Sequence, residues 1–186
     1  MAHGYVLVMA DALRDTTARV AQEATDTVRE EVEAYRGASE LPVESFAGLM
    51  VAYAAFVAAG AVAVRRRGLP ERPAWSDVAL VGVATHRLSR LIAKSPVTSP
   101  LRAPFARFES VSGSAELKEG VRGTGARKAI GELVTCPFCI SQWLATGFTF
   151  GLVLAPRATR MASAVLTSVT AADFLQFARC AAEQHT

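Results

Sequence analysis

Hydrophobic residues gather in long blocks along this chain, and charged or turn-forming segments separate the blocks. Residues 46–64 form an uncharged run, and a second long run follows a Cys-Pro-Phe-Cys motif within residues 131–155. At ~1.5 Å per residue, such runs are long enough to cross a hydrocarbon core of roughly 30 Å. This pattern is typical of membrane spans and differs from that of one buried core.

The other blocks also predict helices. Within residues 1–45, hydrophobic side chains recur at spacings of seven and four, which predicts an amphipathic helix with a narrow apolar stripe. The stripe fits packing on this protein itself, or a coiled coil with a copy or a partner protein. Residues 75–93 predict an amphipathic or membrane helix, and residues 132–181 predict an antiparallel membrane hairpin that turns at Pro156.

Two polar segments connect these helices. Residues 65–74 form a basic linker that begins with three arginines, and residues 94–131 form a basic, flexible loop rich in Gly, Ser and Pro. The expected fold is therefore all-α: a multi-pass membrane protein with three to four membrane helices, a C-terminal hairpin and an N-terminal amphipathic helix.

Composition and charge agree with a membrane location. Hydrophobic residues make up 51% of the chain, which is high for a soluble protein. Residues 94–132 carry seven basic and four acidic side chains, whereas residues 1–45 carry four basic and nine acidic ones. A basic segment beside apolar helices meets lipid headgroups more often than nucleic acid. We therefore expect the lipid bilayer as a partner, and no nucleic acid.

The positive-inside rule places both basic segments in the cytoplasm. They can share that side only if residues 75–93 do not cross the membrane; otherwise the three arginines break the rule. Both arrangements put the basic loop and the cysteines in the cytoplasm.

Several polar residues and glycines have predicted roles within the membrane region. Gly147 and Gly151 form a small-residue pair that lets another helix approach closely. Asp173 interrupts an apolar segment, and a carboxylate in that position needs a partner, for which His86 or Arg87 is at the right depth. An ion or proton pathway is the alternative role for Asp173. The cations expected to reach lipid headgroups are Arg87, Arg90, Lys94 and Arg102.

The three cysteines are the residues with the most reactive chemistry. An odd number cannot pair completely within one chain, and reduced thiols are the simpler interpretation. Cys136 and Cys139 begin a helix, where the positive end of the dipole favours thiolates and hence redox exchange or metal binding. If Cys180 lies at the same membrane face, three thiolates and His86 could hold a zinc ion. The favoured interpretation is the packing of small polarisable side chains where a helix enters the membrane, which needs no cofactor; redox exchange and a zinc site are the alternatives.

Three motifs occur in order, namely Thr-His-Arg-Leu-Ser-Arg-Leu-Ile at 85–92, Pro-Leu-Arg-Ala-Pro-Phe at 100–105, and Gly-Glu-Leu-Val-Thr-Cys-Pro-Phe-Cys-Ile-Ser-Gln-Trp at 131–143. With two apolar helices after them, they resemble a family of small bacterial membrane proteins known as domain of unknown function 1360, which includes a Bacillus sporulation protein. The resemblance covers roughly residues 76–180. The family often has an acid soon after the first motif, where this chain has Ser95. The resemblance implies a helical protein of the bacterial inner membrane and no established activity.

No complete catalytic constellation occurs in the sequence. We therefore expect a non-enzymatic membrane scaffold, anchor or partner-binding subunit, which binds a copy or a partner through its N-terminal helix. The alternative is a thiol-redox or structural-metal protein that uses the Cys-Pro-Phe-Cys motif.

Overall fold

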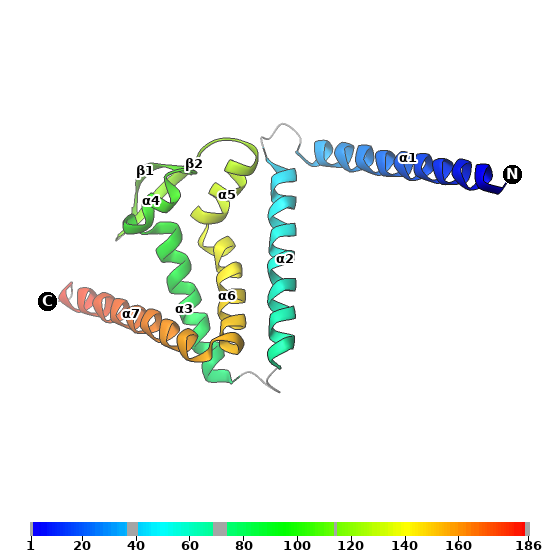
Figure 1. Ribbon diagram of the computed structural model, residues 1–186. Coiled ribbons are helices and arrows are strands. Elements are labelled where there is room, and N and C mark those ends of the chain that lie inside the picture. The colour runs from blue at the N-terminus through cyan, green and yellow to red at the C-terminus, as the bar shows by residue number, and fades with distance from the viewer. Residues whose placement is uncertain (1, 37–40, 69–73, 114, 185–186) are drawn as a thin grey trace. The chain divides into compact units, whose positions relative to one another are not determined.

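The computed structural model describes residues 2–36, 41–68, 74–113 and 115–184, which are mostly helical (Figure 1). The chain divides into two compact units, Met1–Val43 and Glu44–Thr186. The first unit contains helix α1 (Ala2–Arg36), which agrees with the predicted N-terminal helix. Its 35 residues span about 52 Å at ~1.5 Å per residue. Val20 and Val28 of the apolar stripe are 60% and 62% exposed.

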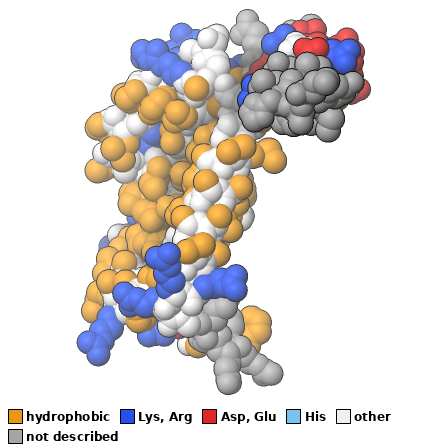
Figure 2. Space-filling model, turned by 45° about the vertical axis from the view of Figure 1, so that its right-hand side comes forward, with side chains coloured by type: hydrophobic (Ala, Val, Ile, Leu, Met, Phe, Trp, Pro, Cys, Tyr) orange, Lys and Arg blue, Asp and Glu red, His pale blue; other side chains and the backbone are white. Residues whose placement is uncertain are grey.

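The second unit has four long helices: α2 (Val43–Arg67), α3 (Trp75–Lys94), α6 (Pro137–Leu154) and α7 (Pro156–Glu183). Among the described residues, three helices are long and apolar enough to cross a membrane, namely α2, α6 and α7. Figure 2 shows hydrophobic side chains spread over the outside of this helical unit, with Lys and Arg gathered toward its ends.

Helix α3 lies at the centre of the second unit. It packs against both α6 and α7, and more extensively against each than those two pack on each other. The face that it buries is made of small side chains, with Ala84, Ser89 and Ala93 all at most 3% exposed. Small residues let helix backbones approach closely, which is how membrane helices pack without a hydrophobic driving force.

The predicted hairpin is present as a sharp reversal at one residue, Ala155, which links α6 directly to α7. The amide of Ala155 donates to the Gly151 carbonyl at 2.8 Å, and its own carbonyl accepts from Thr159 at 3.0 Å. The two helices then diverge (Figure 1), and α3 lies against both of them. The C-terminal region is therefore a three-helix arrangement and not an isolated pair.

Helix α2 contacts α6 through aromatic side chains. The ring centroids of Tyr53 and Trp143 are 5.1 Å apart, and Phe56 lies between Trp143 and Phe150, at 5.9 and 6.0 Å. The Tyr53 hydroxyl also accepts a hydrogen bond from Gln142 at 2.8 Å. Aromatic pairs of this kind add about 0.5–1.5 kcal/mol beyond the area that they bury.

The segment predicted as a flexible loop, residues 94–131, is instead folded. It contains η1 (Pro96–Thr98), α4 (Ser99–Arg102), β1 (Ala106–Gly113), β2 (Glu116–Val121) and the start of α5 (Gly125–Thr135). The two strands form an antiparallel hairpin that pairs Ala106 with Val121 and is irregular at two points. The expectation of an all-α fold was therefore wrong in this region, although the protein as a whole is mostly helical. We call residues 95–135 the polar cap.

A buried ion pair holds the polar cap together. Arg102 is 0% exposed, and its guanidinium forms an ion pair with Glu119 of β2. The same guanidinium donates to the carbonyl oxygens of Ile92 and Ser95, which are left unpaired where α3 ends, and to Thr98 Oγ1 at 2.7 Å. One arginine thus joins the end of α3, the short helices and the strand hairpin.

Candidate functional site

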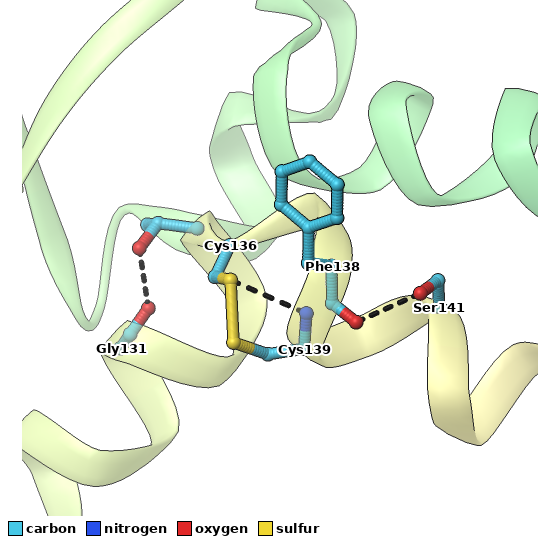
Figure 3. The surroundings of a disulfide bond; sticks show 6 residues. Gly131, Cys136, Phe138, Cys139 and Ser141 are labelled. Atoms are coloured by element: carbon cyan, nitrogen blue, oxygen red, sulfur yellow. Dashed lines mark hydrogen bonds between the residues drawn. A yellow bond between two sulfur atoms is a disulfide. The ribbon is translucent and has the colours of Figure 1, made fainter.

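The Cys-Pro-Phe-Cys motif lies where α5 ends and α6 begins (Figure 3). Cys136 has extended backbone geometry and caps α6: its Sγ accepts from the Cys139 amide at 3.2 Å, and its carbonyl accepts from Ile140 at 3.1 Å. Pro137 occupies the first helical turn, where its missing N–H costs nothing. The motif therefore starts the helix by itself, whatever other chemistry it has.

The two sulfurs of this motif are joined in a disulfide, which differs from the expected reduced thiols. Figure 3 shows the Phe138 ring pointing away from the bridge. Cys139 is exposed, and the Phe138 side chain is 87% exposed. Both lie at the surface, where a partner molecule can reach them.

Cys180 does not join this pair; it is a free, exposed thiol near the end of α7. Within the described part of the chain, no group of three or more His, Cys, Asp or Glu side chains is placed to hold a metal ion. The predicted zinc ligand set of Cys136, Cys139, Cys180 and His86 is therefore not assembled. The reason lies in the path of α7, which diverges from α6 after Ala155.

A cavity of about 230 Å³ lies between α3 and the first turns of α6. It is lined by Gly82, Thr85, His86, Ser89, Arg90, Pro137, Phe138 and Ser141. Thr85 is 7% exposed, and its hydroxyl has no hydrogen-bond partner among the described residues. A buried polar atom without a partner costs roughly 1–3 kcal/mol. This hydroxyl oxygen is itself buried and does not open onto the cavity.

Two ion pairs connect α3 to α7. Near the start of α3, Asp77 accepts two hydrogen bonds from Arg160, at 2.8 and 2.6 Å. Farther along, Arg87 donates to Asp173 at 2.6 Å. The ion pair predicted for Asp173 is thus present, with Arg87 and not His86 as its partner. The two bridges fix the register of α7 along α3.

Three of the four cations expected at lipid headgroups have carboxylate partners within the protein. Arg87 pairs with Asp173, Arg90 pairs with Glu116 in a bidentate contact, and the buried Arg102 pairs with Glu119. Because Arg102 is 0% exposed, it cannot reach a headgroup, and that part of the prediction was wrong. Lys94 is half-buried, and its role at headgroups stays a prediction.

The two glycines of the predicted packing pair contact different helices. A Cβ on Gly151 would lie 2.6 Å from Thr159 Oγ1, so this glycine permits the close start of α7. A Cβ on Gly147 would lie at an ordinary 3.8 Å from Phe56 of α2. The pair therefore lies between two neighbours and does not form one continuous seam.

Sequence reasoning missed the residues that organise the polar cap. Glu116 and Glu119 lie in a segment predicted to be flexible, yet they receive Arg90 and Arg102. Glu116 and Glu119 are three residues apart, and on a regular strand side chains at that spacing point to opposite faces. The sequence therefore gave no sign that the two residues share a role. Thr85 was missed because a single threonine in a helix has no special signature.

Comparison with known proteins now gives the family. The profile of a family described as protein of unknown function (DUF1360) matches residues 80–179, more than half of the chain. The chain belongs to this family. The matched region runs from α3 into α7 and includes the cavity, the polar cap and the cysteine pair. Sporulation protein YjcA of Bacillus subtilis (strain 168) is 34% identical over 71 residues, which cover 37% of this chain and 60% of that relative. No solved structure gives a significant match.

Proposed function

We propose that this DUF1360 protein is an integral, multi-pass protein of the bacterial inner membrane that acts as a non-enzymatic scaffold. One observation carries the membrane part of the proposal. In the most apolar stretch of α2, of α6 and of α7, only 6%, 0% and 11% of the residues, respectively, are buried within the protein. Large side chains such as Met50, Phe174 and Leu175 are 73%, 69% and 72% exposed. Soluble proteins rarely leave apolar surface of this extent open to water, whereas lipid covers it.

Membrane extraction tests this part of the proposal. After cell lysis, the full chain should stay with the membranes through an alkaline carbonate wash and should leave them only in detergent. Release by carbonate, or a monodisperse protein in buffer without detergent, would contradict membrane integration.

The proposed partner surface is the apolar stripe of α1. Val20 and Val28 are exposed within their unit, and they lie eight residues, about 12 Å, apart along the helix. We assign this stripe to a helix of a second copy or of a partner protein, because apolar positions at heptad-like spacing fit such pairing. The sporulation role of the Bacillus relative is named in that protein's description only.

A pair of variants tests the stripe. Val20→Asp with Val28→Asp places two charges on the stripe, and Ala18→Asp with Gln22→Asp places the same two charges on other sides of the helix. Chemical crosslinking in intact membranes should give an adduct through α1 in the wild type and in the Ala18→Asp, Gln22→Asp variant. The Val20→Asp, Val28→Asp variant should give no such adduct. Equal crosslinking of both variants would remove α1 from the proposal.

The orientation of the protein is also part of the proposal. The contact of Arg67 with the Leu154 carbonyl, at 3.4 Å, supports an arrangement in which α2 and α6 end at the same face. The chain then returns along α3, so the three arginines and the polar cap lie on opposite sides. Residues 87–131 contain nine Lys and Arg residues, and residues 65–74 with 156–160 contain six. We therefore place the polar cap and the cysteines in the cytoplasm.

Thiol labelling tests this placement. The pair is a disulfide in the structure, and a cytoplasmic location would expose it to a reducing compartment that converts it to a dithiol. A membrane-impermeant thiol reagent should then label a Cys180→Ser variant only in opened cells. If labelling required a reductant but not opened cells, the pair would be an external disulfide and the orientation would be reversed.

A second candidate function is thiol–disulfide exchange, and it is supported by the bonded Cys136 and Cys139 sulfurs and by the exposure of Cys139. In this reaction the reduced pair attacks the disulfide of a partner, passes it two electrons and two protons, and ends as the Cys136–Cys139 disulfide. Replacing both cysteines with serine decides between the functions. The scaffold predicts unchanged α1 crosslinking, and exchange predicts loss of disulfide reduction in a partner.

A further inference from the structure

The strand hairpin of the polar cap has two chemically different faces. Residues directly opposite each other on antiparallel strands point to the same face of the sheet. Phe108 therefore shares a face with Glu119, and Val111 shares a face with Leu117. Leu117 and Glu119 are two residues apart on β2, which places all four side chains on one face. We call it the inner face of the hairpin.

The inner face is turned toward the helices, which cover its β2 half. Glu119 forms the ion pair with Arg102, and the Arg102 guanidinium also donates to the Ile92 carbonyl at the end of α3. Val121, two residues beyond Glu119 on the same face, lies beside α5, because a Cβ added to Gly131 would be 2.5 Å from Val121 Cγ1. Figure 1 shows α4 and the end of α3 close to the hairpin. These contacts hold β2 on the helices.

The β1 half of the inner face is open. Phe108 and Val111 are 62% and 66% exposed. The other face of the hairpin is polar: Ser110 and Lys118 lie there, directly opposite each other, and Lys118 forms an exposed ion pair with Glu109. Two large apolar side chains thus protrude on the side of the hairpin that faces the helices, and polar groups lie on the side that faces away.

The turn end of the hairpin lies at the depth where a proposed span begins. Glu116, the first residue of β2, pairs with Arg90 in a bidentate contact. Arg90 lies four residues before Lys94, the last residue of α3, which is about 6 Å back along that helix. Arg90 also lines one cavity together with Pro137 and Phe138, the first residues of α6. The hairpin therefore extends alongside α3 to the level at which the apolar helix α6 starts.

We propose that β1 lies in the interfacial layer of the bilayer, in the leaflet at the cap end, with Phe108 and Val111 inserted between lipid headgroups. An amphipathic element in this layer buries its apolar side only ~5–10 Å deep and keeps its polar side in water. Lipid is the occupant that the geometry favours, because both side chains protrude toward the helices and lie near the start of α6. This inference rests on the proposed membrane insertion.

Spin labels on single cysteines test the position of β1. The full chain, with its three native cysteines replaced by serine, is labelled in turn at Phe108→Cys, Val111→Cys, Ser110→Cys and Met50→Cys. It is reconstituted into vesicles of phosphatidylethanolamine and phosphatidylglycerol. Collisions with oxygen, which concentrates in lipid, are compared with collisions with a water-soluble nickel chelate. The ratio of the oxygen rate to the nickel rate should be several-fold higher at Phe108 and Val111 than at Ser110.

The label at Met50 separates this inference from the proposed function, because Met50 is 73% exposed on α2. A high ratio at Met50 with a low ratio at Phe108 and Val111 would overturn the interfacial hairpin and leave membrane insertion intact. A low ratio at Met50 would contradict membrane insertion itself. Low collision rates with both reagents at Phe108 and Val111 would mean that protein, such as a second copy, covers them, and would also overturn the proposal.

A pair of charge variants tests whether Phe108 holds β1 at the interface. With the label at Val111→Cys, Phe108→Glu should lower the oxygen-to-nickel ratio several-fold, because a carboxylate is costly among acyl chains. Ser110→Glu adds the same charge to the polar face and should leave the ratio unchanged. Both positions are exposed, so both variants should unfold in micelles at the temperature of the parent chain. Equal ratios in the two variants, or a lower unfolding temperature for Phe108→Glu alone, would overturn the anchoring role of Phe108.

Discussion

The apolar helices and the polar cap of this protein are stabilised in different ways. Helices α2, α6 and α7 bury few of their own side chains and leave large hydrophobic residues outside. The cap buries a charged residue completely, Arg102, and surrounds it with carbonyl oxygens and a carboxylate. The first region depends on its surroundings to cover apolar surface, and the second satisfies its own polar groups. Substitutions should therefore have large effects in the cap and small ones on the outer surfaces of the helices.

The largest effect should come from Arg102→Ala. This change leaves the Glu119 carboxylate buried without its cation, which typically costs about 3–5 kcal/mol. It also removes the guanidinium donors to the Ile92 and Ser95 carbonyls, which then have only the Thr98 hydroxyl as a side-chain donor. The free energy of unfolding in mixed micelles, measured by denaturant titration, should fall by that amount. Lys118→Ala is the control, because its pair with Glu109 is exposed and should contribute less than about 1 kcal/mol. Equal losses of unfolding free energy in the two variants would mean that the buried Arg102–Glu119 pair contributes no more than the exposed pair.

Gly131→Ala should have the next largest effect. A Cβ at this position would lie 2.5 Å from Val121 Cγ1 and 3.0 Å from the Phe105 carbonyl oxygen, and that backbone atom cannot move freely. Overpacking of this kind costs about 1–3 kcal/mol, more than the gain in helix propensity. Gly48→Ala on α2 meets nothing within 4 Å and should not destabilise the protein. Thermal unfolding of the two variants side by side would show whether the close contact of Gly131 in the cap contributes to stability.

The ion pair between Arg87 and Asp173 should contribute less, about 1 kcal/mol, as interhelical polar contacts in membranes do. A double-mutant cycle with Arg87→Gln and Asp173→Asn measures the coupling energy between them. The exposed Arg179–Glu183 pair within α7 is the reference, and it should couple by less than about 0.5 kcal/mol. A coupling of several kcal/mol for Arg87 and Asp173 would place a strong polar contact among the helices and weaken the contrast with the cap.

The smallest effect should be a gain. Ala115, at the turn of the strand hairpin, has φ of 60°, a conformation that glycine adopts more easily. Ala115→Gly should raise the unfolding free energy by a few tenths to about 1 kcal/mol, whereas Ala126→Gly in the first turn of α5 should lower it by a few tenths of a kcal/mol. A loss of stability in both variants would indicate that the turn is not strained.

The predictions made from sequence succeeded where a local pattern was enough. An uninterrupted periodicity predicted α1, an uncharged run predicted α2, and Asp173 within an apolar segment predicted an ion pair. They failed where distant residues had to meet. Glu116 and Glu119 appeared as ordinary charges of a loop, since nothing near them in the chain shows that Arg90 and Arg102 are their partners. The proposed zinc ligands assumed that Cys180 returns to Cys136, and α7 diverges instead.

The sequence by itself determined the helical blocks, their apolar character and the family, because those depend on composition and on short periodic patterns. Only the tertiary structure decided that the basic segment folds, that Arg102 is buried, and that Thr85 is left without a partner beside a cavity. The physical reason is that a buried ion pair or an unsatisfied hydroxyl is defined by what surrounds it, and those surroundings come from α3, α6 and the strand hairpin together.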